Sequence, residues 1–269
     1  MSLRALAVVG LSLILLSCTA FLISGIGCGM DAACVLMSRT PAQMFVSGVR
    51  LLSIVGGAGF LAWVVRLTWV LAAAARYLRR LPTAPLANTL ADAAGHAHVT
   101  RVAVLDVDTP EAFCAGVWRP TVFVSQGLVL RLREKEMLAV LWHEGCHARR
   151  RDPLRRAAYR SAADLLRPIA VVRWWIERRL DLAELLADRL ALHEVGATAL
   201  AGAMWRAQCP AREWTVGFGE AGSARVAQLL GDTPPRQWPP SAVWARSALG
   251  IIFMIGIGGC LAGGAISVL

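Results

Sequence analysis

Three long apolar runs stand out in the pattern of hydrophobic and polar positions. Residues 3–27 carry a single charge near their start, and residues 247–269 carry none. Residues 46–75 form another run, which is interrupted by Arg50 and Arg66, side chains that can extend toward a membrane surface. Each run reaches the roughly 20 residues that an apolar helix needs to cross a bilayer. The pattern therefore predicts three transmembrane helices.

A secretory signal is the other interpretation of the first run, since residues 15–18 (LLSC) loosely resemble a lipoprotein cleavage site. The apolar run continues well past Cys18, whereas the apolar core of a signal peptide has roughly 7–15 residues. We therefore interpret residues 3–27 as a transmembrane helix.

Residues 82–240 have the mixed pattern of a folded domain, with Pro-rich segments at both ends. Short alternating or apolar segments predict strands at 101–107, 112–118 and 121–127. Longer periodic segments predict helices at 86–95, 134–151, 152–167 and 169–195. Asp152 and Pro153 suit the N-cap and first position of the third helix, and Gly196 stops the last.

Trp174 and Trp175 lie in the first turns of the predicted 169–195 helix. Paired Trp side chains in an apolar stretch suit two places, the membrane interface and the core of the domain. The sequence leaves both open.

These elements predict a fold class: a mainly α membrane protein in which three transmembrane helices flank an α+β domain with a small β-sheet. Residues 1–75 form two N-terminal transmembrane helices with a short outer loop. Residues 76–246 form the soluble domain, and residues 247–269 form the C-terminal transmembrane helix.

The charge distribution predicts the orientation in the membrane. The formal charge is +10, and Arg clusters follow the second run (Arg76, Arg79 and Arg80) and lie within the domain. By the positive-inside rule the N-terminus and residues 76–246 are cytoplasmic and the C-terminus is extracytoplasmic, in a multi-pass protein of a bacterial plasma membrane. Anionic membrane lipid accounts for the Arg clusters, so no nucleic-acid partner is expected.

Residues 143–147 (HEGCH) form the candidate catalytic motif. On a helix, His143 and His147 face the same side, about 40° apart, and two such imidazoles can bind one tetrahedral zinc. Glu144 lies one step round and can take a proton from a water molecule as general base. Gly145 costs about 1 kcal/mol of helix propensity but leaves room for a neighbouring segment.

A catalytic zinc also needs a third protein ligand. Glu184 and Asp188 are four residues apart on one face of the 169–195 helix, so Glu184 can bind the metal while Asp188 accepts the other N–H of a zinc histidine. His193 lies about 180° round that helix from Glu184 and should point away. The alternative for this acidic pair is a solvated helix face. His96 and His98 suit solvated positions better than metal ligation.

Two smaller features keep two interpretations each. Cys28 and Cys34 fall in the short outer loop, where they form a disulfide or stand as unpaired small residues. Gly259 and Gly263 form a GxxxG pattern in the last apolar run, which either packs helices closely, including in a homodimer, or reflects the ordinary Gly content of such helices.

The motifs resemble a known family. The segments HEGCHARRRDP (143–153) and ELLADRLAL (184–192), with the upstream 113–141, resemble the integral-membrane zinc metallopeptidases of the BlaR/MecR type (peptidase family M fifty-six, gluzincin clan MA). The chain is also similar to the related Ste24/HtpX-type proteases. The RRRD after the second His favours the BlaR/MecR type.

The resemblance implies a cytoplasmic gluzincin-like domain holding one Zn²⁺ per chain. His143, His147 and Glu184 would be its ligands, Glu144 the general base and Asp188 the partner of a ligand. An edge strand that pairs with an extended substrate would consist of Thr121, Val122, Phe123, Val124 and Ser125. The extracytoplasmic penicillin-binding sensor of those receptors is not part of this sequence, so β-lactam sensing is not supported.

The expected function is therefore that of an integral-membrane zinc endopeptidase with an HExxH and ExxxD site. It would cleave a cytoplasmic or membrane-proximal protein or peptide in regulated proteolysis, by analogy a repressor or the protease itself. The alternative is a non-catalytic membrane scaffold or receptor with a structural or vestigial zinc site. An intact Glu144 argues against this alternative, because a structural site needs no base.

Overall fold

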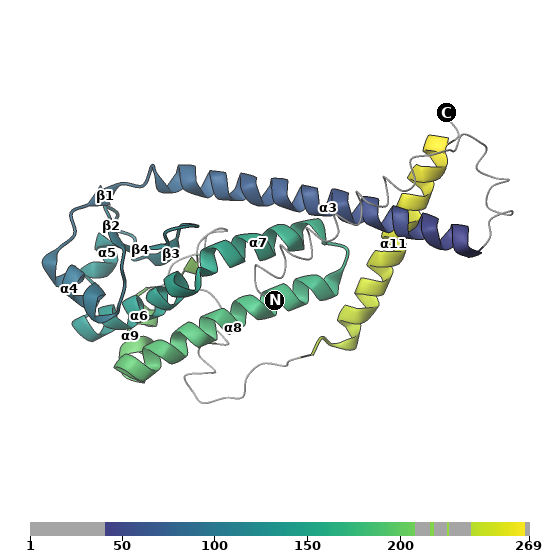
Figure 1. The fold of residues 1–269 in the computed structure, drawn as a ribbon. Coiled ribbons are helices and arrows are strands. Elements are labelled where there is room, and N and C mark those ends of the chain that lie inside the picture. The colour runs from purple at the N-terminus through teal and green to yellow at the C-terminus, as the bar shows by residue number, and fades with distance from the viewer. Residues whose placement is uncertain (1–40, 208–215, 218–224, 226–237, 267–269) are drawn as a thin grey trace. The chain divides into compact units, whose positions relative to one another are not determined.

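The computed structural model describes residues 41–207, 216–217, 225 and 238–266 (Figure 1). The chain divides into two compact units, one formed by Met1–Arg66 with Ala248–Leu269 and the other by Leu67–Ser247. The predicted span at 3–27 and the Cys28–Cys34 pair lie outside the described residues.

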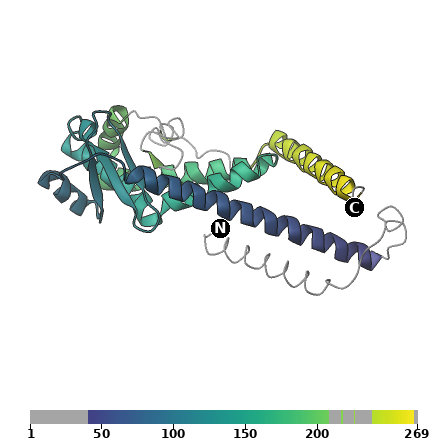
Figure 2. The same ribbon diagram turned by 90° about the horizontal axis from the view of Figure 1, so that it is seen from above.

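The second unit is mostly helical with a small mixed sheet, and its helices lie beside the sheet (Figures 1 and 2). Within the described residues, the helices are α3 (Pro41–Leu78), α4 (Asn88–His96), α5 (Gln126–Val129), α6 (Glu134–Arg150), α7 (Asp152–Leu165), α8 (Ala170–Val195), α9 (Ala197–Arg206) and α11 (Ser241–Ile266). The strands are β1 (Thr83–Ala84), β2 (Val102–Leu105), β3 (Ala112–Ala115), β4 (Thr121–Ser125) and β5 (Val216–Gly217).

One helix among the described residues is long and apolar enough to cross a membrane. It is the part of α3 from Ser53 to Leu78. The predicted span at 247–269 falls mostly within α11, and Ser241–Ile252 is an apolar stretch among the residues whose side chains are described. Of the three predicted transmembrane helices, the described residues thus include one candidate, identified by its length and composition.

The strands pair in the order β1-β2-β4-β3-β5. β4 lies in the middle, parallel to β2 from Val102↔Val122 to Leu105↔Ser125 and antiparallel to β3 from Ala112↔Val124 to Ala115↔Thr121. The outer positions among the described strands belong to the two-residue strands β1 and β5.

The expectation that Thr121–Ser125 is an edge strand is therefore wrong. β4 uses its backbone groups on both sides for β2 and β3, so it has no free edge for an extended peptide. Its side chains are also committed to the core: Val122 and Val124 have no exposed surface. The hydroxyl of Ser125 accepts hydrogen bonds from the backbone N–H of Glu111 and of Leu128.

α6 is the central helix of the domain. It packs against β3, β4, α8 and α9, with Val140 and Leu141 fully buried in the main core. Its start is capped by Glu136, whose carboxylate accepts from the backbone N–H of Arg133 at 2.9 Å and pairs with Arg206 of α9.

The expectation that Gly145 leaves room for a neighbour is confirmed. A Cβ at this position would lie 2.9 Å from Cγ2 of Val99 and 3.2 Å from Nη1 of Arg149. The segment after α4 therefore approaches α6 at the turn that carries the two histidines.

One expected helix start differs in detail. Arg151, in the left-handed conformation at φ 55° and ψ 40°, forms the junction between α6 and α7 and is the N-cap of α7. Asp152 is already the first helical residue, so its carboxylate is available for another task.

Candidate metal centre

α6 carries His143 and His147, and α8 carries Glu184. The two helices bring these side chains together, although Glu184 follows His147 by 37 residues in the sequence. Nε2 of His143 lies 3.2 Å from Nε2 of His147. Oε2 of Glu184 lies 3.4 Å from Nε2 of His143, and Oε1 lies 3.7 Å from Nε2 of His147. All three side chains are buried, and we call them the His/His/Glu cluster.

These spacings fit a tetrahedral zinc ion. Ligand bonds of about 2.0–2.2 Å at tetrahedral angles place neighbouring N and O ligand atoms about 3.3–3.5 Å apart. The distances of 3.2 and 3.4 Å match this edge length, and that of 3.7 Å lies slightly above it. Among the described residues, this is the one group of three or more His, Cys, Asp or Glu side chains that could hold a metal ion.

Each of the two histidines forms a hydrogen bond to a carboxylate through the ring nitrogen that faces away from the cluster. Nδ1–H of His143 donates to Oδ1 of Asp188 at 2.8 Å, and Nδ1–H of His147 donates to Oδ2 of Asp152 at 3.0 Å. A carboxylate can only accept, so each ring is held in the tautomer that carries its proton on Nδ1. The Nε2 lone pairs of both rings then point into the cluster, where a metal ion would use them.

Two arginines complete the surroundings. The guanidinium of Arg225 has no exposed surface and binds Asp188 through two bonds, with Nε donating to Oδ2 at 2.6 Å and Nη2 donating to Oδ1. Nη1 of Arg156, a buried residue of α7, lies 3.8 Å from Oε1 of Glu184.

The centre holds four buried carboxylates, those of Glu144, Asp152, Glu184 and Asp188. Arg156 lies beside Glu184, Arg225 binds Asp188, and the partly exposed Arg150 and Arg155 lie 3.4 and 3.3 Å from Asp152. Glu144 is the one of the four carboxylates that none of these ion pairs includes, and a divalent cation at the cluster would lie beside it.

Glu144 is fully buried beside the cluster, and neither of its carboxylate oxygens has a hydrogen-bond partner among the described residues. Burying an unpaired carboxylate costs several kcal/mol, so this arrangement points to a role in binding or chemistry. Burial raises the pKa of Glu144 to about 7, although the nearby His143 and His147 lower it. The group is thus suited to exchange a proton near neutral pH.

The carboxylates around His147 favour a positive charge at this position, and they raise its pKa. Burial alone lowers this pKa, but the charge of Glu184 and the hydrogen bonds to Asp152 and Glu184 raise it to about 10. A proton on His147 and a metal ion at the cluster would meet the same need.

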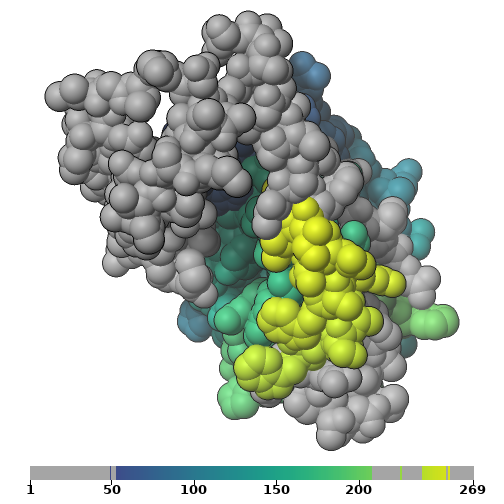
Figure 3. Space-filling model, turned by 90° about the vertical axis from the view of Figure 1, so that its right-hand side faces the viewer, coloured from purple at the N-terminus to yellow at the C-terminus, as the bar shows by residue number. Residues whose placement is uncertain are grey.

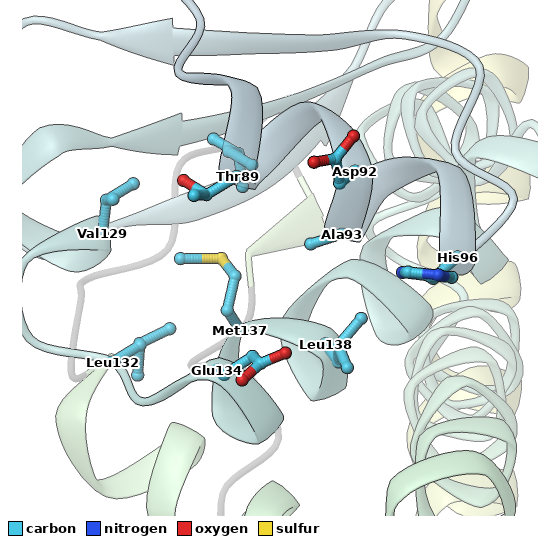
Figure 4. A pocket seen from close by; sticks show the side chains of 10 residues that line it. Thr89, Asp92, Ala93, His96, Val129, Leu132, Glu134, Met137 and Leu138 are labelled. Carbon is cyan, nitrogen blue, oxygen red and sulfur yellow. The ribbon is translucent and has the colours of Figure 1, made fainter.

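The remaining histidine candidates lie elsewhere. His193 is exposed, and its Nδ1 lies 3.0 Å from Oε1 of Glu194, so it points away from the cluster as expected. His98 is exposed. His96 is also exposed, and it lines a separate cavity of about 490 Å³ between α4 and the start of α6 (Figure 4).

Three residues of the centre were missed in the sequence. Asp152 carried a signal, its position five residues after His147, but an Asp-Pro pair is equally typical of a helix start. Arg156 lies one turn further on in an Arg-rich stretch in which no single Arg stands out. Arg225 carried no signal, since it follows Asp188 by 37 residues outside any recognisable motif.

Residues 83–210, just under half of the chain, match the model of peptidase family M48. This gluzincin-type family is related to the Ste24/HtpX-type proteases, so the match indicates a metallopeptidase and gives no specific support to the BlaR/MecR type. The matched range includes the His/His/Glu cluster, Glu144 and Asp188. No curated protein matches this chain.

Proposed function

We propose that this protein is a membrane-anchored zinc endopeptidase, with His143, His147 and Glu184 as zinc ligands and Glu144 as general base. One observation carries the proposal: three buried ligand atoms lie at tetrahedral spacing beside a buried carboxylate that has no partner among the described residues. The match of residues 83–210 to peptidase family M48 supports the same activity.

When bound, zinc supplies a Lewis acid that polarises the scissile carbonyl and lowers the pKa of a water molecule. Glu144 is placed to accept the proton of that water and to pass it to the leaving amine. Asp188 and Asp152 hold the imidazole rings in the required tautomer, and Arg225 holds Asp188. Burial of the cluster strengthens each of these interactions.

A non-catalytic zinc site is less well supported. Structural zinc sites are typically closed by four protein ligands, whereas catalytic sites use three and keep one position open. The described residues offer three ligands, which leaves the fourth position open for a water molecule beside the carboxylate of Glu144.

The membrane anchor is proposed from α3 and the sequence. Ser53–Leu78 is apolar enough to span a bilayer, and the predicted spans at 3–27 and 247–269 would add two crossings. By the positive-inside rule, the Arg clusters support a cytoplasmic position for the proposed peptidase domain.

The test uses the purified full-length protein in detergent, as wild type and as Glu144→Gln. We expect both to hold one zinc per chain by elemental mass spectrometry, because Glu144 is not a ligand. Wild type should cleave a proteome-derived peptide library, and Glu144→Gln should not. Zinc without cleavage in either protein would favour the scaffold, and absence of zinc from both would refute the metal site.

A further inference from the structure

α7 and α8 form an antiparallel pair that runs away from the sheet and turns back at residues 166–169 (Figures 1 and 2). The turn and the first residues of α8 carry exposed apolar side chains. Leu165, Leu166 and Trp175 are each more than a third exposed. The core interpretation of the paired Trp residues is therefore wrong for Trp175.

Trp174, Trp175 and Trp238 pack together at this end of the domain, and Trp244 lies in the first turn of α11; we call these four side chains the tip tryptophans. The rings of Trp174 and Trp175 are 5.3 Å apart, and those of Trp175 and Trp238 are 6.4 Å apart, both edge to face. Trp238 is 69% exposed and Trp244 is 51% exposed. Trp174 is half-buried, whereas Trp175, Trp238 and Trp244 are exposed, unlike Trp side chains of a protein core.

The tip is joined to the start of α11. The backbone N–H of Val171 donates to Oγ of Ser247 at 2.7 Å, and that hydroxyl donates to the backbone carbonyl of Val243. Ser247 is the last residue of the second unit, and α11 continues beyond it as an apolar helix. Exposed side chains follow directly: Leu249, Ile251, Ile252 and Met254. Figure 3 shows the first turns of α11, in yellow, on the face of the molecule that it draws.

The chemistry of the tip fits the headgroup layer of a bilayer. Trp is enriched at membrane interfaces because its ring is largely apolar while its N–H is polar. Exposed Arg residues lie close in sequence to these Trp residues: Arg167, Arg173 and Arg246. Arg167 and Arg173 have acidic neighbours in Asp164 and Glu177, and all three Arg can contact lipid phosphates.

We propose that the tip tryptophans insert into the headgroup layer of an anionic phospholipid bilayer and fix the peptidase domain against the membrane. The exposed Trp side chains and the neighbouring Arg residues suit lipid headgroups as the partner of this surface. A loosely tethered domain would need no such surface, because the transmembrane helices alone would hold it near the membrane.

The membrane contact fixes how far the proposed peptidase site lies from the bilayer. The substrate preference that follows rests on the proposed peptidase activity. Glu184 follows Ala170 by fourteen residues of α8, which is about 21 Å along the helix at 1.5 Å per residue. An extended peptide covers 21 Å in about six residues. The favoured substrates are therefore membrane-anchored proteins, cut in an extended segment close to the end of a span.

The test measures quenching of Trp emission by brominated lipid. The full-length protein is reconstituted in phosphatidylcholine–phosphatidylglycerol vesicles, with the bromines placed either near the headgroup or near the acyl-chain end. Trp63 and Trp69 of α3 are changed to Phe throughout. One variant also carries Phe at the tip tryptophans, and the matched control carries Phe at Trp118 and Trp205, which are 80% and 75% exposed elsewhere.

We expect headgroup-level bromines to quench more strongly than deep ones. The quenched share of the emission should fall in the tip variant and rise in the control. Equal quenched shares in the two variants, or a rise in the tip variant, would overturn the proposal and point to a protein partner for this surface. Circular dichroism checks the fold, and Trp175→Phe with Trp238→Phe serves as a milder variant. The quenching measurement depends neither on zinc nor on cleavage. It can therefore refute the membrane contact without bearing on the proposed peptidase activity.

Discussion

Asp152 accepts a hydrogen bond from His147, as Asp188 does from His143. Asp152 belongs to the first turn of α7, whereas Asp188 belongs to α8. We predict that Asp152→Asn lowers zinc affinity about 10–100-fold, the usual effect of losing the carboxylate partner of a ligand histidine. Competition with a zinc chelator measures it. Asp164→Asn, at the other end of α7, is the matched control and should leave the affinity unchanged; an equal effect of both changes would refute the role of Asp152.

Arg225 neutralises Asp188 in the interior. We predict that Arg225→Gln lowers the free energy of unfolding by about 3–5 kcal/mol, because it leaves a buried carboxylate without its cation. Denaturant unfolding in detergent measures the change. Arg173→Gln removes an exposed ion pair with Glu177 and should have little effect. If Arg225→Gln were equally mild, the pair would not stabilise the site.

At the scale of single residues, sequence spacing predicted what lies on one helix. His143 and His147 share a face because they are four apart, and the same rule pairs Glu184 with Asp188. It could not predict Arg225, because no local period relates this residue to the centre. Asp152 was misread because a residue type that suits helix starts can also accept from a histidine.

Gly145 shows how one element constrains another. Ala normally stabilises a helix relative to Gly, but a Cβ here would lie 2.9 Å from Cγ2 of Val99. We predict that Gly145→Ala destabilises the protein by roughly 1–3 kcal/mol through overpacking. Gly95→Ala, where a Cβ meets nothing within 4 Å, should stabilise it by roughly 0.5–1 kcal/mol. Thermal unfolding compares the two, and Val99→Ala should relieve the first; the same sign for both Gly changes would contradict this packing.

The helices and strands were largely predictable from hydrophobic periodicity and from the Pro, Gly and capping residues at their ends. The expected helix at 134–151 is α6, and that at 169–195 is α8. The place of β4 in the sheet was not predictable, because strand order depends on pairing between segments far apart in sequence. An alternating pattern shows that a strand exists and says nothing of whether its edge is covered.

For the whole molecule, the arginine distribution predicts a cytoplasmic peptidase domain and an extracytoplasmic C-terminus. A phosphatase that is active only outside the cytoplasm should therefore be active when fused after Leu269 and inactive when fused after Arg80. The reverse pattern would refute the orientation, and activity at neither site would remove the predicted last crossing.

The central claim is that this protein cleaves other proteins with Glu144 as base. The most direct measurement compares the protein N-termini of host cells that express wild type or Glu144→Gln at matched membrane levels, under resting and cell-wall-stressed conditions. We predict new N-termini in the wild-type cells that disappear in the mutant, lying close to the cytoplasmic ends of spans. Identical sets of N-termini under both conditions would contradict the peptidase assignment.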